Sequence, residues 1–389
     1  MAGAAQAVKQ GPLAGLRVVE LAGIGPGPMC AMLLADLGAD VLRIDRPQPV
    51  ERGIKRPLKY DLLLRSRTTI ALDLKKPAVV ESVLDLIERA DALIEGYRPG
   101  VAERLGLGPD VCLARNPRLI YGRMTGWGQS GPLSHTAGHD LGYIAITGVL
   151  NAIGRKDQPP SVPLNLIGDY SGGSLYLALG ILAGIIEARV SGQGQVVDAA
   201  IVDGAASLAT TFFGMHAAGM LRPKRGTNMT DSGSHFYDVY ECADGKWLAV
   251  GPIESRFYTQ LLQILEIDPT ELGPQLDPAH WPQAKAVLSD KIRTKARDEW
   301  AALFEHTDAC VAPVLDWSEA PEHPQFKARG TFVEVDGVVQ PAPAPRFSRT
   351  TPNKPRPPNE IDLARTESAL RTWLGDAKLA HLRRSGILD

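Results

Sequence analysis

The first 125 residues alternate between short apolar segments and segments whose apolar residues have helical spacing. Residues 17–21 predict a strand, the glycine- and proline-rich residues 22–28 a loop, and residues 29–37 a helix that ends at Gly38. Further strands are expected at 41–45, 69–74, 92–95 and 119–124, with a helix at 78–90. Because parallel strands need a long crossover between them, this alternation predicts an α/β fold with a doubly wound, Rossmann-like parallel sheet.

The pattern changes after about residue 200, and 389 residues are more than one hydrophobic core usually holds. We therefore predict four parts: a large Rossmann-like domain (1–200), a linker rich in Ala, Gly and Met (201–234), a smaller α+β domain (235–330) and a return segment (331–389).

Local patterns support the last two parts. The small domain is expected to contain a hairpin, 236–242 with 246–250, and then helices at 257–265, 282–294 and 298–305. Seven prolines between residues 340 and 358 predict an extended connector, because proline donates no backbone hydrogen bond. Helical patterns at 367–374 and 379–385 are expected to pack on the large domain.

Charge and composition exclude several classes. The net charge of −2 gives no whole-chain sign of nucleic-acid binding. Residues 1–12 lack the apolar core of a signal peptide, and the most apolar stretch, 175–186, is shorter than a membrane span and predicts a buried helix. We expect a cytoplasmic protein without a membrane span.

The four cysteines form no CxxC pair and are expected to be free thiols: Cys30, Cys112, Cys242 and Cys310.

The loop Gly23-Ile-Gly-Pro-Gly-Pro28 follows the first strand and invites a dinucleotide-binding interpretation, with Asp45 at the end of the next strand. The sixth position of that motif should be small, and here it is Pro28. Pro26 and Pro28 also lack the backbone N–H groups that would bind a pyrophosphate. The pattern favours a tight strand-to-helix turn, and it leaves open that the loop lines a different ligand site.

Two ionisable residues stand at unusual places. His139 follows a glycine-rich loop that begins near Gly126 and precedes a predicted helix. Asp169 lies where the apolar helix starting near Gly172 is expected to begin. Each also has an ordinary structural explanation, a surface histidine at a helix start or an aspartate N-cap, and spacing alone does not decide between them.

Longer motifs resemble a known family. The following segments are similar to the family III CoA-transferases and their relatives: 13–46, Glu95-Gly-Tyr-Arg-Pro-Gly100, Thr125-Gly-Trp-Gly-Gln-Ser-Gly-Pro132 and Gly168-Asp169. Within that superfamily, Ala137-Gly-His-Asp140 and Ile253-Glu254 resemble the branch of α-methylacyl-CoA racemases. The similarity spans about residues 13–349. It implies an interlocked homodimer with sites built from both chains, and an isomerase that racemises 2-methylacyl-CoA thioesters.

That chemistry suits the residues. Removing a proton α to a thioester needs a base on one face, a stabilised enolate and an acid on the other face. His139 has an ordinary pKa of about 6.5, whereas Asp169 needs its pKa raised by burial, which a helix N-terminus opposes. The N–H groups of Gly168 and Asp169 are candidate donors to the enolate oxygen. The resemblance implies that Glu254 bonds His139 and fixes its tautomer, and Asp140 could do similar work.

CoA carries phosphates that need cationic partners. Arg46 and Arg98 follow predicted strands and Arg104 comes a short loop later, at the sheet edge where ligands collect. The resemblance implies further CoA contacts: Leu72, Asp73, Leu74, Lys75, Gly96, Tyr97, Gly138, Leu141, Gly142 and Tyr143. CoA enters as part of the substrate, so neither a separate cofactor nor a metal is expected.

Two alternatives remain beside racemisation. In a CoA-transferase, Asp169 would be a nucleophile that forms a mixed anhydride; a CoA-binding protein with an idle site is the other. His139 and the loop Gly251-Pro-Ile-Glu-Ser255, which is not a glycine-rich run, favour racemisation. Two segments, 47–61 and 354–389, depart from the family pattern and have no functional account.

The acyl group cannot be read from the sequence. The apolar residues expected near the site suit a methyl-branched fatty acid or a sterol side chain: Ile24, Pro26, Leu141 and Ile253.

Overall fold

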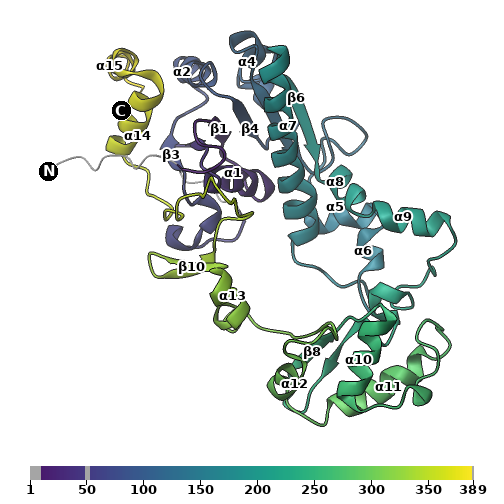
Figure 1. Ribbon diagram of the computed structural model, residues 1–389. Coiled ribbons are helices and arrows are strands. Elements are labelled where there is room, and N and C mark those ends of the chain that lie inside the picture. The colour runs from purple at the N-terminus through teal and green to yellow at the C-terminus, as the bar shows by residue number, and fades with distance from the viewer. Residues whose placement is uncertain (1–9, 49–52, 388–389) are drawn as a thin grey trace. The chain divides into compact units, whose positions relative to one another are not determined.

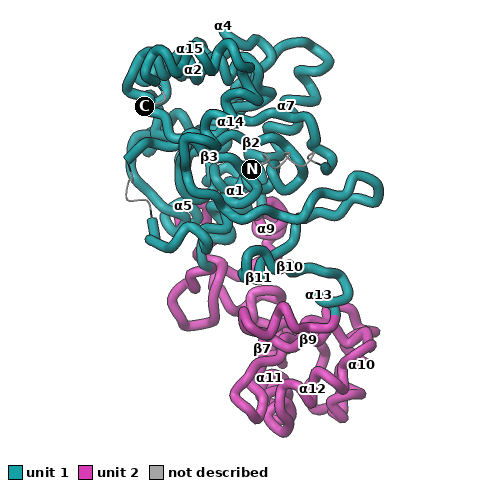
Figure 2. Tube along the Cα trace, turned by 90° about the vertical axis from the view of Figure 1, so that its left-hand side faces the viewer, with its two compact units in different colours: residues 1–144, 164–208, 325–389 teal, residues 145–163, 209–324 magenta. Residues whose placement is uncertain are grey.

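The computed structural model describes residues 10–48 and 53–387, so part of the segment 47–61 lies outside the described residues. The chain divides into two compact units (Figure 2). Unit 1 comprises residues 1–144, 164–208 and 325–389, and unit 2 comprises 145–163 and 209–324. The chain therefore enters unit 2 twice and returns to unit 1 twice.

Unit 1 is built on a six-stranded sheet in which every neighbouring pair is parallel, in the order β3-β2-β1-β4-β5-β6. The strands are β1 (Arg17–Leu21), β2 (Asp40–Asp45), β3 (Thr68–Ala71), β4 (Ala92–Glu95), β5 (Ile120–Thr125) and β6 (Gln195–Ala200). This confirms the predicted parallel sheet. β6 was missed because it is an edge strand whose first four residues are not buried, which leaves no apolar run to read.

Helices cover both faces of this sheet (Figure 1). Side chains that alternate along a strand belong to different cores: Val18 packs with α1 (Pro26–Asp36) and α7 (Tyr176–Ser191), and Val19 packs with α2 (Pro77–Ile87) and α14 (Leu363–Leu374). The remaining helices of unit 1 are α3 (Val101–Arg104), α4 (Pro109–Arg115), α8 (Ile201–Leu208) and α15 (Asp376–Arg384). Two more, α5 (Asp140–Ile146) and α13 (Pro324–Arg329), cross the boundary between the units.

The strand order fixes where a ligand site is expected. The chain winds outward in one direction from β1 and in the other from β4, so the crevice at their carboxyl ends is the switch point of the sheet. The loop 22–25 leaves β1 there and leads into α1, and residues 96–98 leave β4 there.

Helix α7 differs from its sequence-based prediction. Its inner residues, such as Leu177 and Ile181, are buried on the sheet, but Leu179 and Ile186 are 64% and 66% exposed. The prediction of a buried helix is therefore right for one face only. In the described part of the chain, the continuous helix Leu166–Ser191 is long and apolar enough to cross a membrane by length and composition, as core helices of soluble proteins also can be.

The return segment closes unit 1. Leu370 and Trp373 of α14 are buried in the core beside α2, and Figure 1 shows α14 and α15 there. Arg65 bonds both Asp36 of α1 and the segment at Gln340 and Pro341. A hairpin of β10 (Phe332–Val335) and β11 (Val338–Pro341) precedes the proline-rich connector, so regular structure extends to Pro341.

Unit 2 holds a three-stranded antiparallel sheet, β7 (Asp238–Glu241), β8 (Trp247–Val250) and β9 (Val311–Pro313), in that order. Its helices are α6 (Val149–Ala152), α9 (Thr210–Ala217), α10 (Ser255–Leu265), α11 (Trp281–Ile292) and α12 (Arg297–Phe304). The predicted hairpin is confirmed, whereas three-residue β9 was too short to predict. Residues 201–234, expected as a linker, contain α8 and α9 instead.

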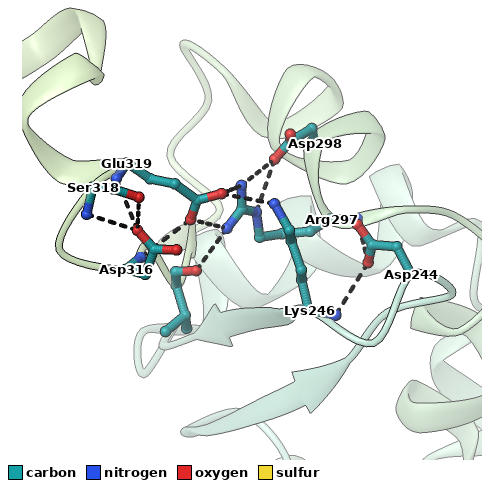
Figure 3. Close-up of polar contacts among 8 residues, drawn as sticks. Asp244, Lys246, Arg297, Asp298, Asp316, Ser318 and Glu319 are labelled. Carbon is teal, nitrogen blue, oxygen red and sulfur yellow. Dashed lines mark hydrogen bonds and ion pairs between the residues drawn. The ribbon is translucent and has the colours of Figure 1, made fainter.

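An ion cluster ties three parts of unit 2 together (Figure 3). The carboxylate of Glu319 accepts hydrogen bonds from Arg297 at 2.7 and 2.9 Å and from Lys246 at 2.7 Å. Arg297 begins α12 and Lys246 lies beside the hairpin turn. The bonds from Arg297, and then Lys246, hold the pKa of Glu319 well below its ordinary value.

The pKa of Glu319 is lower in the folded protein than in the unfolded chain, where it is about 4.3. The ion cluster therefore stabilises the fold fully above that pH, and this stabilisation is lost progressively as the pH falls toward the pKa of the folded state. We expect Glu319→Gln to lower the thermal midpoint at pH 7, with a difference from wild type that shrinks between pH 4 and pH 3. Circular dichroism melts at each pH measure it. Glu271→Gln, an exposed glutamate of the same unit, is the control. A difference in thermal midpoint between wild type and Glu319→Gln that does not change with pH would contradict the lowered pKa of Glu319.

Candidate active site

Asp169 lies in the first turn of a π-helix, η3 (Leu166–Leu175), which runs directly into α7. The helix therefore begins six residues before the expected start near Gly172. Widened π turns are rare and are often found at functional sites. Glycine permits a close approach here: a Cβ on Gly204 of α8 would lie 1.8 Å from the carbonyl oxygen of Gly172. The backbone of α8 thus packs directly on the helix that carries Asp169.

The Asp169 carboxyl faces the switch point of the sheet. Its Oδ2 accepts a hydrogen bond from Asn165 Nδ2 at 3.3 Å. A Cβ on Gly25 would lie 3.3 Å from the same oxygen, and Gly25 has φ of 64°, where side chains are strained. The loop between β1 and α1 is therefore a tight strand-to-helix turn that ends at Gly25, three residues earlier than expected, and Gly25 lies against Asp169.

The surroundings of Asp169 raise its pKa. Burial is the largest cause, the bond from Asn165 opposes it, the charge of Asp140 raises the pKa further, and the charge of His139 lowers it. The direction agrees with what an acid near neutral pH requires. The effect of His139 also means that the two predicted acid/base residues are close enough to interact.

His139 is exposed and stands immediately before α5, where its carbonyl oxygen accepts the N–H groups of Gly142 and Tyr143. The Tyr143 ring meets the Trp127 ring edge to face, with centroids 4.7 Å apart. A Cβ on Gly138 would lie 2.6 Å from the Tyr143 ring, so the loop before His139 closes tightly over these aromatics.

Asp140 corrects two sequence-based predictions. Its Oδ2 accepts the N–H of Asp169 at 2.6 Å, and the carboxylate also accepts the N–H of Gly168. Its other oxygen, Oδ1, is buried without a hydrogen-bond partner, so Asp140 does not bond the imidazole of His139 as expected. The two N–H groups proposed as donors to an enolate are likewise occupied. Both predictions are wrong because the side chain of Asp140 turns toward η3.

The sequence places the chain among known proteins. The model of CoA-transferase family III matches residues 13–360. The chain belongs to CoA-transferase family III. It is 43% identical to α-methylacyl-CoA racemase of Mus musculus, over 89% of this chain and 90% of that protein, and 42% identical to the enzyme of Homo sapiens, over 87% of each. A CAIB/BAIF family protein from Brucella suis has a similar structure, with a TM-score of 0.79, 26% identity, and coverage of 95% of this chain and 100% of that one.

The predicted CoA contacts of this family member follow the carboxyl ends of three strands of the parallel sheet, β2 and β3 on one side of β1 and β4 on the other. Arg46 follows β2, residues 72–75 follow β3, and residues 96–98 follow β4. Arg46, Lys75, Arg98 and Arg104 are all exposed. The side chain of Leu72 is buried, so only its backbone could contact a ligand.

One of the predicted contacts, Tyr143, lies close enough to Asp169 to interact with it, and Arg98 lies close to Tyr143. The pKa of Tyr143 is raised by burial and by the charge of Asp169, and is lowered by the charge of Arg98. The remaining predicted contacts are Asp73, Leu74, Tyr97, Gly138 and Gly142, half-buried, and Gly96 and Leu141, exposed.

Glu254 belongs to unit 2. It is exposed and precedes α10, accepting the N–H groups of Phe257 and Tyr258 at its carbonyl oxygen. Its pairing with His139 stays a prediction.

Sequence reasoning missed Asn165. It lies four residues before Asp169, the spacing at which side chains meet on a helix, but the helix was expected to begin only after it. Residues 10–48 and 53–387 contain no group of His, Cys, Asp and Glu residues arranged to hold a metal, and all four cysteines are free.

The contact between α8 and η3 can be tested with two alanine substitutions. Gly204→Ala would force a methyl group against the carbonyl of Gly172, so we expect a loss of about 1–3 kcal/mol in the free energy of unfolding. Gly214→Ala in α9, where nothing lies within 4 Å, is the control and should be neutral or stabilising by up to ~1 kcal/mol. Urea denaturation measures both. Equal effects would contradict the close packing.

Proposed function

We propose that the chain is an α-methylacyl-CoA racemase, an isomerase that interconverts the two epimers of 2-methylacyl-CoA thioesters. The observation that carries the proposal is the environment of the Asp169 carboxyl at the switch point of the sheet. This carboxyl is half-buried, its pKa is raised, and it interacts electrostatically with His139. Identity of 42–43% to two proteins named α-methylacyl-CoA racemase, over most of each chain, supports it.

The reaction needs one base and one acid on opposite faces of the α carbon. In one direction, one residue of the pair takes the α proton, the C–H electrons pass into an enolate, and the other residue returns a proton to the opposite face. In the reverse direction the roles exchange. Burial serves this exchange because it disfavours the charged carboxylate, which raises the pKa of Asp169 and favours its acid form.

CoA transfer is the rival function, because the family includes that chemistry. There Asp169 would attack the thioester carbonyl as a carboxylate, forming a mixed anhydride and breaking the C–S bond to release the CoA thiolate. A carboxyl with a raised pKa is less often ionised, which suits proton return better than attack. The presence of His139 at the site and the loop 251–255, which is not glycine-rich, also favour racemisation.

Further residues belong to the proposal. Arg46, Arg98 and Arg104 are exposed cations suited to the phosphates of CoA. Glu254 would bond His139 and fix its tautomer. The two protein groups and the CoA thioester supply all the chemistry of the reaction, so we propose that no separate cofactor takes part. Activity in EDTA equal to that without it would support this part.

Racemisation and CoA transfer differ in α-proton exchange. A single epimer of a 2-methylacyl-CoA incubated in D₂O, with no acceptor acid, should gain α-deuterium and converge on both epimers, as NMR and chiral chromatography measure. Absence of exchange, together with CoA transfer once a carboxylate is added, would refute the racemase proposal.

The same assay tests the pair. We expect His139→Ala and Asp169→Ala each to slow racemisation by about 10²–10⁴-fold, the usual contribution of general acid–base catalysis. His135→Ala, an exposed histidine in the same loop, should leave the rate unchanged. A normal rate in either variant of the pair would remove that residue from the mechanism.

We also propose that the enzyme is a homodimer, as the family resemblance implies, and that α7 contributes to the interface. The outer face of α7, together with the end of η3 that runs into it, carries four exposed apolar residues at helical spacing: Leu175 of η3 and Leu179, Ile186 and Val190 of α7. Because its inner face is packed on the sheet, α7 is not a free helix that lipid could surround. Apolar patches of this kind mark protein interfaces.

Leu179→Glu would place a charge in that face without disturbing the core, since Leu179 is already exposed. We expect it to convert the dimer to a monomer in size-exclusion chromatography with light scattering. Leu363→Glu, an equally apolar exposed position at the start of α14, should leave the dimer intact. A monomeric wild type, or one that binds liposomes through this face, would contradict the proposed interface.

A further inference from the structure

Asp140 joins the two members of the candidate acid/base pair. It is adjacent to His139 along the chain, and its carboxylate reaches across to the backbone that carries Asp169. Among the described residues it is buried, with 5% of its surface exposed. A buried carboxylate in this position constrains both partners at once.

The contact with η3 is a two-pronged clamp. Oδ2 of Asp140 accepts the N–H of Asp169 at 2.6 Å, and the carboxylate of Asp140 also accepts the N–H of Gly168. These are N–H groups of the first helical turn, which have no partner within a helix. A Cβ on Gly168 would lie 2.4 Å from that oxygen, so glycine is needed for the carboxylate to come this close. The clamp therefore fixes the position of the backbone of Asp169 relative to α5.

Asp140 also affects Asp169 through its charge. Its Oδ1 has no hydrogen-bond partner, so half of the carboxylate is not compensated by local donors. Burial raises the pKa of Asp140, while the two N–H bonds favour its ionised form. Two other titratable groups interact with the Asp169 carboxyl: His139 and Tyr143. Arg98 acts on Tyr143, and the uncharged amide of Asn165 donates a hydrogen bond to Asp169.

We propose that Asp140 is a positioning residue for proton transfer: it holds Asp169 in register with His139 through the Gly168 and Asp169 N–H groups, and it places a second carboxylate beside the Asp169 carboxyl. This role rests on the proposed racemase function, but the clamp itself does not. Asp140 touches neither the imidazole of His139 nor, on this proposal, the reacting carbon.

Two substitutions separate the clamp from the charge. Asp140→Asn keeps an oxygen that can accept the N–H groups but removes the charge, whereas Asp140→Ala removes both. For Asn we expect the acid limb of the pH profile of α-deuteration to move to lower pH, because the pKa of Asp169 falls without a neighbouring negative charge. For Ala we expect the rate at every pH to fall by roughly 10²-fold, the cost of a misplaced catalytic group.

Two readouts do not depend on activity. Hydrogen–deuterium exchange of a peptide covering Gly168 and Asp169 should stay slow in Asp140→Asn and become fast in Asp140→Ala. The carbon-13 titration of the Asp169 carboxyl, assigned with Asp169→Asn, should move to lower pH in Asp140→Asn. Asp110→Asn, an exposed aspartate on α4, controls for loss of one charge and should change neither measurement.

The outcomes distinguish the two proposals. A wild type that deuterates no α carbon refutes the racemase function, and amide exchange and the carboxyl titration still decide the role of Asp140. Unchanged amide exchange in Asp140→Ala overturns the clamp. A wild-type pH profile and an unmoved carboxyl titration in Asp140→Asn overturn the role of the charge and leave Asp140 a purely structural residue.

Discussion

Close backbone contact between η3 and α8 is the constraint on which the site depends. Gly172 and Gly204 approach so closely that neither could carry a side chain, and this lets a widened helical turn lie against the carboxyl end of the sheet. The turn in turn presents Asp169 to the loop after β1 and to α5. A bulkier sequence would separate these elements, and the carboxyl would lose both its burial and its neighbours.

Electrostatics at this site works against the usual preference of a buried carboxyl for cationic partners. Asp169 lies near a second carboxylate, Asp140, and accepts a hydrogen bond from the uncharged amide of Asn165. The cation Arg98 acts on the neighbouring Tyr143 instead. Like charges in a partly buried place disfavour double ionisation. The arrangement is unfavourable for stability and favourable for a group that must hold and release a proton near neutral pH.

The sequence was sufficient to predict the elements that have a regular pattern of buried apolar residues. β1 and β4 were placed to the residue, because short apolar strands between turns leave little choice. β6 escaped because an edge strand needs no apolar run, and the π start of η3 escaped because a regular helical spacing does not describe it. Motifs put His139 and Asp169 in one site, but adjacency along the chain gave Asp140 the wrong partner, since side-chain direction depends on the backbone. The pairing of Glu254 is still a prediction.

The division of the chain has a consequence for biosynthesis. Unit 1 takes core residues from both early and late segments: Val83 of α2 packs in the same core as Leu370 and Trp373 of α14. During translation the sheet must therefore wait, with one apolar face covered only in part by α2, until unit 2 has been made and residues 363–374 have left the ribosome. Unit 2, whose core lies within one stretch of chain, has no such delay. Helices α14 and α15 thus complete the cover on one face of the sheet. A nascent chain interrupted before them would expose apolar surface of the kind that chaperones bind.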